Sequence, residues 1–133
     1  MNQKLVKYGF ILAALMNFSV IIFSRGFTNV AINEADPVVM SNFGLLMIVI
    51  WGLAYLAVAS VTANVKWLVA TFALEKLIYG VVWLTWLSNN SLAEIYSTDI
   101  FAGIFYSIYG VNDLLFMLFF SYIFFTASQR ANS

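Results

Sequence analysis

The sequence contains no cysteine and no histidine. Without thiols there is no disulfide, no thiol redox relay and no thiolate metal site. Without imidazole, histidine-ligated haem, histidine-bound zinc and Ser-His-Asp catalysis are excluded. A hard-cation site built from carboxylates and carbonyls stays open, but we expect no metal centre and no cofactor. The sequence shows no pair of a nucleophile and a base that would indicate an enzyme.

Charged residues are also scarce. The 133 residues include six Lys or Arg and six Asp or Glu, 9% in all, whereas a soluble domain carries about 25%. The balanced charge offers no basic face for nucleic acid, and the seven glycines form no phosphate-binding loop. Because 63% of the side chains are hydrophobic, the surface cannot lie mostly in water. The sequence therefore predicts an integral membrane protein whose first partner is the lipid bilayer.

Four apolar stretches are long enough to cross a membrane as helices, which takes about 20 residues for a hydrocarbon core of about 30 Å. They cover about residues 5–24, 38–61, 67–87 and 100–126. The stretches are apolar on all sides and longer than the roughly 10-residue alternating strands of a membrane barrel. We therefore predict an all-α four-helix bundle, with residues 1–133 forming a single transmembrane domain.

Local sequence signals indicate where helices begin. Asp36 followed by Pro37 is typical of an N-cap and first helical residue, and predicts the start of the second span. Ser91 and Glu94 form a Ser-x-x-Glu capping box, which predicts a short helical turn between the third and fourth spans. We expect the segment 25–42 to be a solvated polar rim.

The charges outside the spans predict the orientation. One side carries only bases, namely Lys4, Lys7, Lys66 and Arg130. The other side carries one base and four acids, namely Arg25, Glu34, Asp36, Glu94 and Asp99. Basic loops remain in the cytoplasm. We therefore expect both termini to be cytoplasmic in a multi-pass protein of the inner (plasma) membrane.

Several polar residues stand inside the spans. Glu75 and Lys76 lie in the third span, Asn112 and Asp113 in the fourth, and Asn17 in the first. A rise of about 1.5 Å per residue places Glu75 about 13 Å and Asp113 about 20 Å from the nearer helix end. Each ionised side chain at that depth costs roughly 2.5–3.5 kcal/mol. We therefore expect these groups to meet in the bundle interior.

The three charged residues inside the spans are two acids, Glu75 and Asp113, and one base, Lys76. We predict that Lys76 faces Asp113, so that the third and fourth spans stabilise each other as a pair. One carboxyl group is then left without a basic partner. Because burial away from water disfavours a charged carboxylate, that group is expected to hold a proton near neutral pH and to donate it to Asn17 or Asn112.

Helix periodicity indicates which side chains face the interior. Thr71, Glu75, Tyr79 and Trp83 recur every four residues along the third span. The expected lining of the bundle comprises Asn17, Tyr55, Glu75, Tyr79, Tyr109, Asn112 and Asp113. An aromatic and partly acidic cavity of this kind suits a small cationic or amphipathic ligand.

Two further patterns concern packing. Trp67, Trp83 and Trp86 lie near the ends of the third span, as expected for an aromatic belt at the membrane surface. Small residues on the fourth span, including Gly103 and Gly110, allow another helix to approach closely. That helix can belong to the same chain or to a second copy.

Two functions follow as expectations. The first is a small membrane protein that binds or carries a small ligand or a proton. Its candidate site comprises Glu75, Lys76, Asp113, Asn112, Asn17, Tyr79, Tyr109 and Tyr55. The alternative is a non-catalytic accessory or structural subunit, in which the charged cluster serves helix packing and the partner is a second copy or another membrane protein.

Overall fold

All regular structure is helical in the computed structural model, which describes residues 2–131 and the side chains of residues 2–127. The helices are α1 (Gln3–Phe18), α2 (Val20–Phe23), α3 (Val30–Ala35), α4 (Asn42–Ala59), α5 (Lys66–Asn89), α6 (Leu92–Thr98) and α7 (Ile100–Ala131). Four segments are long and apolar enough to cross a membrane, because α1 and α2 form one span. The all-helical fold with four candidate spans is as predicted. The side chain of Arg130, expected on the basic side, lies outside the described residues.

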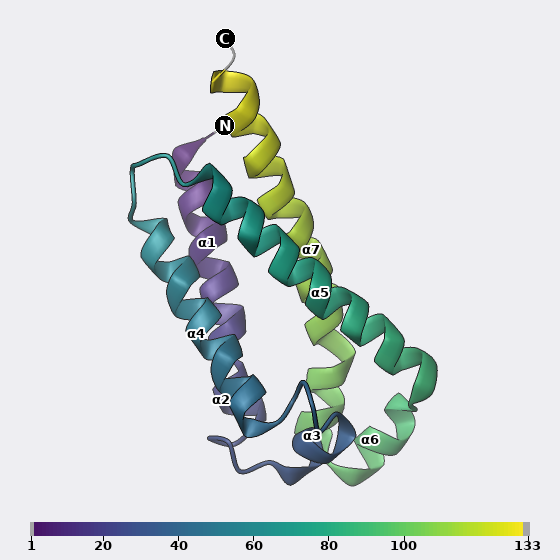
Figure 1. Cartoon of the computed structure of the whole chain (residues 1–133). Coiled ribbons are helices and arrows are strands. Elements are labelled where there is room, and N and C mark those ends of the chain that lie inside the picture. Colours follow the sequence, from purple (N-terminus) through teal and green to yellow (C-terminus); the bar gives the residue numbers. More distant parts are fainter. Residues whose placement is uncertain (1, 132–133) are drawn as a thin grey trace.

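The helices pack as two pairs (Figure 1). α5 packs along α7, and α1 packs along α4, whereas the two pairs meet over a smaller area. α1 begins and α7 ends at the same end of the bundle, which also holds the start of α5. We call it the lysine end, after Lys4, Lys7 and Lys66. The opposite end is the α3 end, where α3 and α6 lie.

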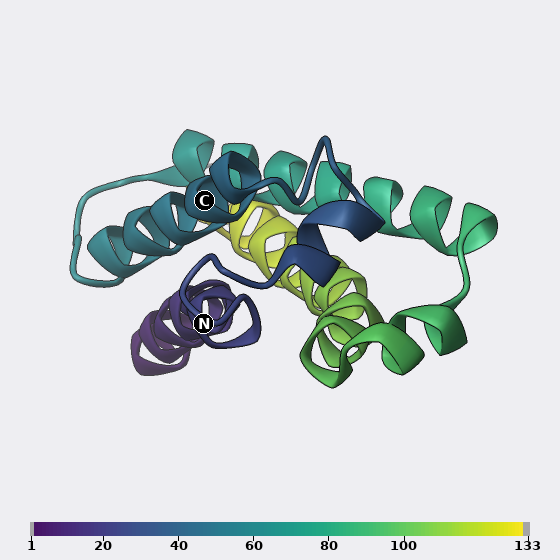
Figure 2. The same ribbon diagram turned by 90° about the horizontal axis from the view of Figure 1, so that it is seen from below.

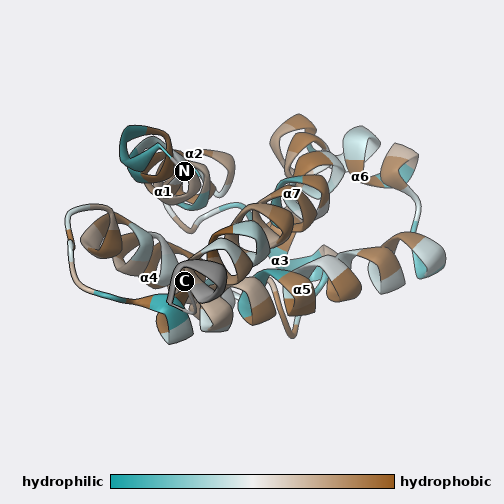
Figure 3. Ribbon diagram, turned by 90° about the horizontal axis from the view of Figure 1, so that it is seen from above, coloured by the Kyte–Doolittle hydropathy of each residue, from teal (hydrophilic) through white to brown (hydrophobic). Residues whose placement is uncertain are grey.

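The outer surface of the bundle is apolar. Large hydrophobic residues such as Leu12, Leu53 and Leu115 are 50–61% exposed, and Figure 3 shows hydrophobic residues along the length of the long helices. The interior holds the buried charges instead. This distribution is the reverse of that in a soluble protein, and it agrees with a membrane environment.

The start of α4 differs from the prediction. Asp36 and Pro37 do not begin it; the backbone N–H of Met40 bonds to Asp36 O in a single turn, and Ser41 then adopts an extended conformation. The Ser41 hydroxyl accepts from the N–H of Gly44 at 3.1 Å and caps α4. The predicted cap at Ser91 is confirmed, since its hydroxyl accepts from the N–H of Glu94.

The segment 25–42 is more than a polar rim, so that expectation is wrong. Although Glu34 is exposed, Ile32 and Met40 are completely buried. α3 lies across the end of the bundle (Figure 2). Because one apolar side chain per turn is enough to anchor so short a helix, hydropathy averaged along the sequence does not reveal this packing.

Trp67 is 73% exposed, as a residue of an aromatic belt would be, whereas the aromatic-belt interpretation is wrong for Trp83 and Trp86, which are buried. The indole N–H of Trp83 donates to Tyr106 O at 2.7 Å, and that of Trp86 donates to Ala35 O at 2.9 Å. Buried indoles are stable here because carbonyl groups inside the fold satisfy their N–H donors.

Packing within the chain fills the small-residue stripe of α7. A Cβ atom added at Gly103 would overlap the ring of Tyr96 on α6, and one added at Gly110 would overlap the ring of Trp83 on α5. The stripe therefore serves intrachain contacts.

Two apolar cores result, one at each end. Aromatic residues such as Trp86 and Tyr106 pack around Ile32 at the α3 end. Phenylalanines such as Phe72 and Phe120 dominate the core at the lysine end. Between these two cores lie the buried polar residues Asn17, Glu75, Lys76 and Asp113.

Candidate functional site

Lys76 occupies the centre of the polar cluster. Its Nζ donates to Asp113 Oδ1 at 2.8 Å and to Asn17 Oδ1 at 3.0 Å. The predicted pairing of Lys76 with Asp113 is thus confirmed. Only 1% of Lys76 and 6% of Asp113 is exposed, so the ammonium group depends on these partners rather than on solvent.

Asn17 connects the two helix pairs. Its Nδ2 donates to Ile48 O on α4 at 2.9 Å, while its Oδ1 accepts from Lys76 on α5. Gly52 permits this close approach, because a Cβ there would lie 3.0 Å from Asn17 Cβ and would overlap the Phe18 ring. The carbonyl of Ile48 is a member of the site that side-chain patterns could not reveal.

Glu75 has a different partner from the one expected. Its Oε2 accepts a hydrogen bond from the hydroxyl of Tyr55 on α4, rather than contacting either asparagine. Lys76 Nζ lies 5.2 Å from the centre of the same tyrosine ring. The expectation of an asparagine partner is wrong, because Asn17 accepts a hydrogen bond from Lys76 and Asn112 donates one to Asp113.

Asn112 supports the ion pair from the side. Its Nδ2 donates to Asp113 Oδ1 at 3.2 Å, so this oxygen accepts from both Lys76 and Asn112. Asn112 is half-buried, whereas Asp113 is buried. Among the described residues, Asp113 therefore has two donors, whereas Glu75 has one, the hydroxyl of Tyr55.

A small cavity adjoins both carboxyl groups. Its volume is about 30 Å³, and its lining includes Glu75, Lys76, Tyr79, Tyr109 and Asp113. A water molecule needs roughly 10–15 Å³ of such space, so the cavity has room for one or two. Tyr55 supports the site from outside the cavity.

Tyr109 faces this cavity with an unsatisfied group. Only 7% of Tyr109 is exposed, and its hydroxyl has no hydrogen-bond partner among the described residues. Buried hydroxyl groups normally find a partner. A small polar molecule in the cavity would satisfy it.

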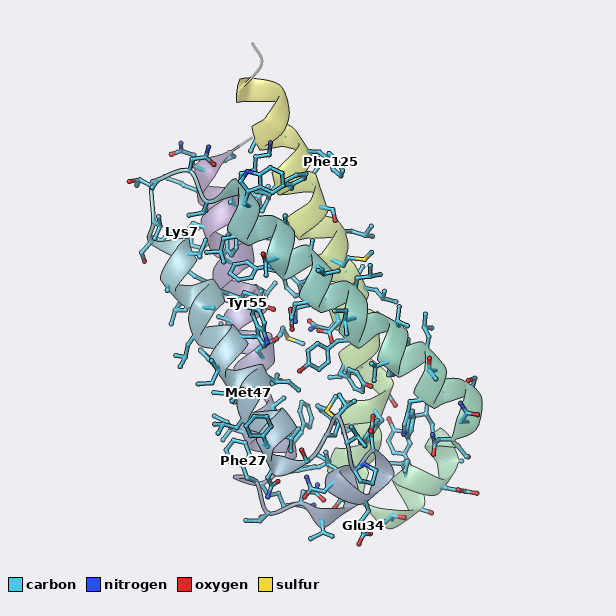
Figure 4. The ribbon with its side chains drawn as sticks, in the orientation of Figure 1. Lys7, Phe27, Glu34, Met47, Tyr55 and Phe125 are labelled. Atoms are coloured by element: carbon cyan, nitrogen blue, oxygen red, sulfur yellow. The ribbon has the colours of Figure 1, made fainter. Side chains whose placement is uncertain are left out.

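The structure brings together seven of the eight candidate residues around the cavity and places Tyr55 beside them. Figure 4 shows Tyr55 at mid-height, between Lys7 at the lysine end and Glu34 at the α3 end. Thr71, expected on the same stripe, is exposed, and its hydroxyl donates to Trp67 O.

No group of three or more His, Cys, Asp or Glu side chains is placed to hold a metal ion in the part of the chain that the structure describes. The polar cluster thus consists of two carboxyl groups, one ammonium group, and amides and phenols. Groups of this kind can bind and release protons and can form hydrogen bonds to a small polar molecule.

Comparisons with protein families, with curated proteins and with solved structures find no match for this chain in any of the three. The site therefore has to be interpreted from its own geometry.

Proposed function

We propose that this chain is a multi-pass membrane protein that binds and releases a proton at Glu75, alone or together with a small polar ligand in the adjoining cavity. The proposal places it in the inner (plasma) membrane with both termini in the cytoplasm. Four long apolar helices support membrane insertion. The three lysines at one end and the acids Glu34, Glu94 and Asp99 at the other support the orientation.

The observation that carries this proposal is the unequal treatment of the two buried acids. Asp113 has an ammonium partner and an amide donor, whereas Glu75 has a phenol. An ionised Glu75 would leave the cluster with one negative charge more than it has positive charges. In a membrane interior such a charge is unfavourable. Protonation of Glu75 makes the cluster neutral.

The surroundings of Glu75 suit proton exchange. The titratable groups around it are Tyr55 on α4, Lys76 and Tyr79 on α5, and Tyr109 and Asp113 on α7. When Glu75 gives its proton to water in the cavity, the Tyr55 hydroxyl stabilises the carboxylate that remains. Lys76 keeps its bonds to Asp113 and Asn17, so the ion pair holds the helices in register while Glu75 changes state.

The second candidate is an accessory subunit in which the cluster only fixes helix packing. The hydrogen bonds of Lys76 to Asp113 and Asn17 favour it, since a buried pair of this kind can specify register without chemistry. The two proposals differ in one measurable respect. Only the first requires Glu75 to change its protonation state in the folded protein.

Infrared difference spectroscopy of the purified protein in lipid nanodiscs tests this requirement. We expect a carbonyl stretch of a buried protonated carboxyl group that disappears as the pH is raised from about 4 to 9. Glu75→Gln should abolish the band, whereas the exposed control Glu94→Gln should retain it. Both variants are expected to retain the helical circular dichroism of the wild type.

A band that survives in Glu75→Gln would assign the proton elsewhere, and a band that is absent in the wild type would support the accessory-subunit proposal. Native mass spectrometry of the same samples then reports whether a second chain remains bound. Asp113→Asn removes the charge of Asp113 but keeps the shape of its side chain. Comparing its infrared band with that of Glu75→Gln separates the effect of losing the ion pair from the effect of losing the Glu75 carboxyl group.

A further inference from the structure

The lysine end contains a hollow that is separate from the polar cluster. It has a volume of about 630 Å³ and lies among the beginning of α1, the end of α4, the segment 60–65, the beginning of α5 and the end of α7. This size falls within the range of about 300–1,000 Å³ that is typical of ligand pockets. The core of phenylalanines separates it from the cavity beside Glu75.

The hollow is positively charged at its rim. Lys4, Lys7 and Lys66 are part of its lining, which includes no carboxylate of the residues whose side chains the structure describes. Lys4 and Lys7 are exposed, and neither forms an ion pair within the described residues. The Nζ of Lys66 lies 5.0 Å from the centre of the Phe124 ring and 5.2 Å from that of Trp67. Contact with two rings positions this ammonium group while leaving its hydrogen-bond donors able to bind an anion.

The floor of the hollow is apolar. Phe10, Val58, Val69 and Ile123 line it, whereas polar side chains such as Gln3 and Asn64 join the lysines nearer the helix ends. An occupant that fits both parts must carry negative charge at one end and hydrocarbon next to it. Basic pockets between membrane-spanning helices bind the headgroups of anionic lipids for this reason.

We propose that this hollow binds the headgroup of an anionic phospholipid, with the phosphate at Lys4, Lys7 and Lys66 and the glycerol and first acyl carbons on the apolar floor. Charge complementarity selects an anion, and the position at the ends of four membrane-crossing segments selects a lipid over a soluble anion. This inference depends on membrane insertion but not on proton exchange at Glu75.

Lipid titrations followed by native mass spectrometry in mild detergent test the proposal. Phosphatidylglycerol and phosphatidylcholine with identical acyl chains are the two probes. We expect the first phosphatidylglycerol molecule to bind at least about ten-fold more tightly, because each lysine near the headgroups contributes roughly five-fold. The preference should weaken as salt is raised.

Matched variants locate the site. Lys66→Gln should lower phosphatidylglycerol binding roughly five-fold, whereas Arg25→Gln, which removes one positive charge at the α3 end, should leave it unchanged. The triple variant Lys4→Gln, Lys7→Gln, Lys66→Gln should lose the preference for phosphatidylglycerol. The corresponding triple arginine variant should keep it.

Equal binding of the two lipids by the wild type, or an unchanged preference in the triple glutamine variant, overturns the proposal. Displacement of the lipid by glycerol 3-phosphate at equal concentration would also overturn it, because the occupant would then be a soluble phosphate compound. Circular dichroism verifies that each variant is folded. Glu75→Gln should bind phosphatidylglycerol like the wild type, so this proposal and the proposed function can fail independently.

Discussion

The two ends of the bundle are closed by different chemistry. At the α3 end, buried aromatic rings carry polar groups that bond to backbone carbonyls: Trp86 donates to Ala35, and the Tyr106 hydroxyl donates to Ile32 O at 2.7 Å. At the lysine end, the rings of Phe10, Phe72 and Phe120 contact one another without a polar group, beneath an open hollow.

The difference shows how an aromatic core can be either fixed or adaptable. A hydrogen bond specifies one position of a ring, whereas contacts between phenylalanines are satisfied by many positions. The stacked pair Trp86 and Tyr106, with ring centres 4.3 Å apart, holds α3 against α5 and α7. We therefore expect the α3 end to be the rigid end and the lysine end to be the one that changes shape.

A pair of glycine substitutions should reveal the largest difference. A Cβ at Gly110 would overlap Cγ and Cδ2 of Trp83, an indole fixed by its bond to Tyr106 O, whereas a Cβ at Gly9 would overlap the tip of the Phe119 ring. Gly110→Ala should therefore lower the free energy of unfolding by about 3 kcal/mol, the upper part of the range for overpacking. Gly9→Ala should lower it by less than about 1 kcal/mol, since Phe119 can rotate away.

Unfolding by sodium dodecyl sulfate in mixed micelles, followed by circular dichroism, measures both values. Equal losses in the two variants would contradict the contrast between a fixed and an adaptable end.

Removal of one indole donor should loosen the α3 end selectively. Trp86→Phe keeps a ring but leaves the carbonyl of Ala35 without its donor, which costs about 1–3 kcal/mol. Hydrogen exchange of the amides in Val30–Ala35 should accelerate, because α3 loses an attachment to α5.

Phe72→Leu is the control for this measurement at the lysine end. It should lower overall stability through lost packing while leaving the exchange rates in α3 relative to the rest of the chain unchanged. Slower or unaltered exchange in α3 of Trp86→Phe would mean that this bond does not hold α3 in place.

Acid should produce the smallest effect, again at the α3 end. Partial burial opposes ionisation of Asp99, but the N–H of Ala102, the Asn29 amide and the Arg25 guanidinium together hold the pKa of Asp99 below its usual range. Because the pKa is lower in the folded state, these bonds contribute fully at neutral pH and are lost as the pH falls below about 4. The contribution of the Arg25 bridge is at most about 1 kcal/mol, since its guanidinium is exposed to solvent.

Unfolding experiments between neutral and acidic pH test this expectation. The variant Asp99→Asn should be less stable than the wild type at neutral pH, and the difference should shrink in acid. A constant difference would indicate that the bonds to Asp99 do not depend on its charge.

Much of the fold could be predicted from the sequence, because hydropathy alone determines which segments must be helical in lipid. What could not be predicted is where short segments return to the bundle. α3 is anchored by the single fully buried residue Ile32 and by carbonyl groups that accept from Trp86 and Tyr106. Backbone acceptors carry no signal in a sequence, so Trp83 and Trp86 looked like residues of the membrane surface.

The residues of the polar cluster could be predicted because the spans contain so few polar residues. A charge such as Lys76 in the middle of a span must find partners in the interior, and the number of polar residues at that depth is small. Lys76 pairs with Asp113 rather than with Glu75, because Asp113 on α7 faces Lys76 on α5. The partnership of Tyr55 with Glu75 depends on the relative rotation of two helix pairs, which no periodicity within one helix determines.

The depth of Glu75 has an electrical consequence. It lies about 13 Å along α5 from the lysine end, about a third of the helix length. A proton that arrives from that end would cross about a third of the membrane voltage, and 100 mV across the full membrane corresponds to about 2.3 kcal/mol per charge. For the proton exchange that we propose, a voltage of 100 mV would then change the protonation equilibrium constant of Glu75 roughly four-fold, so that the site would respond to the polarity of the membrane as well as to the acidity on either side.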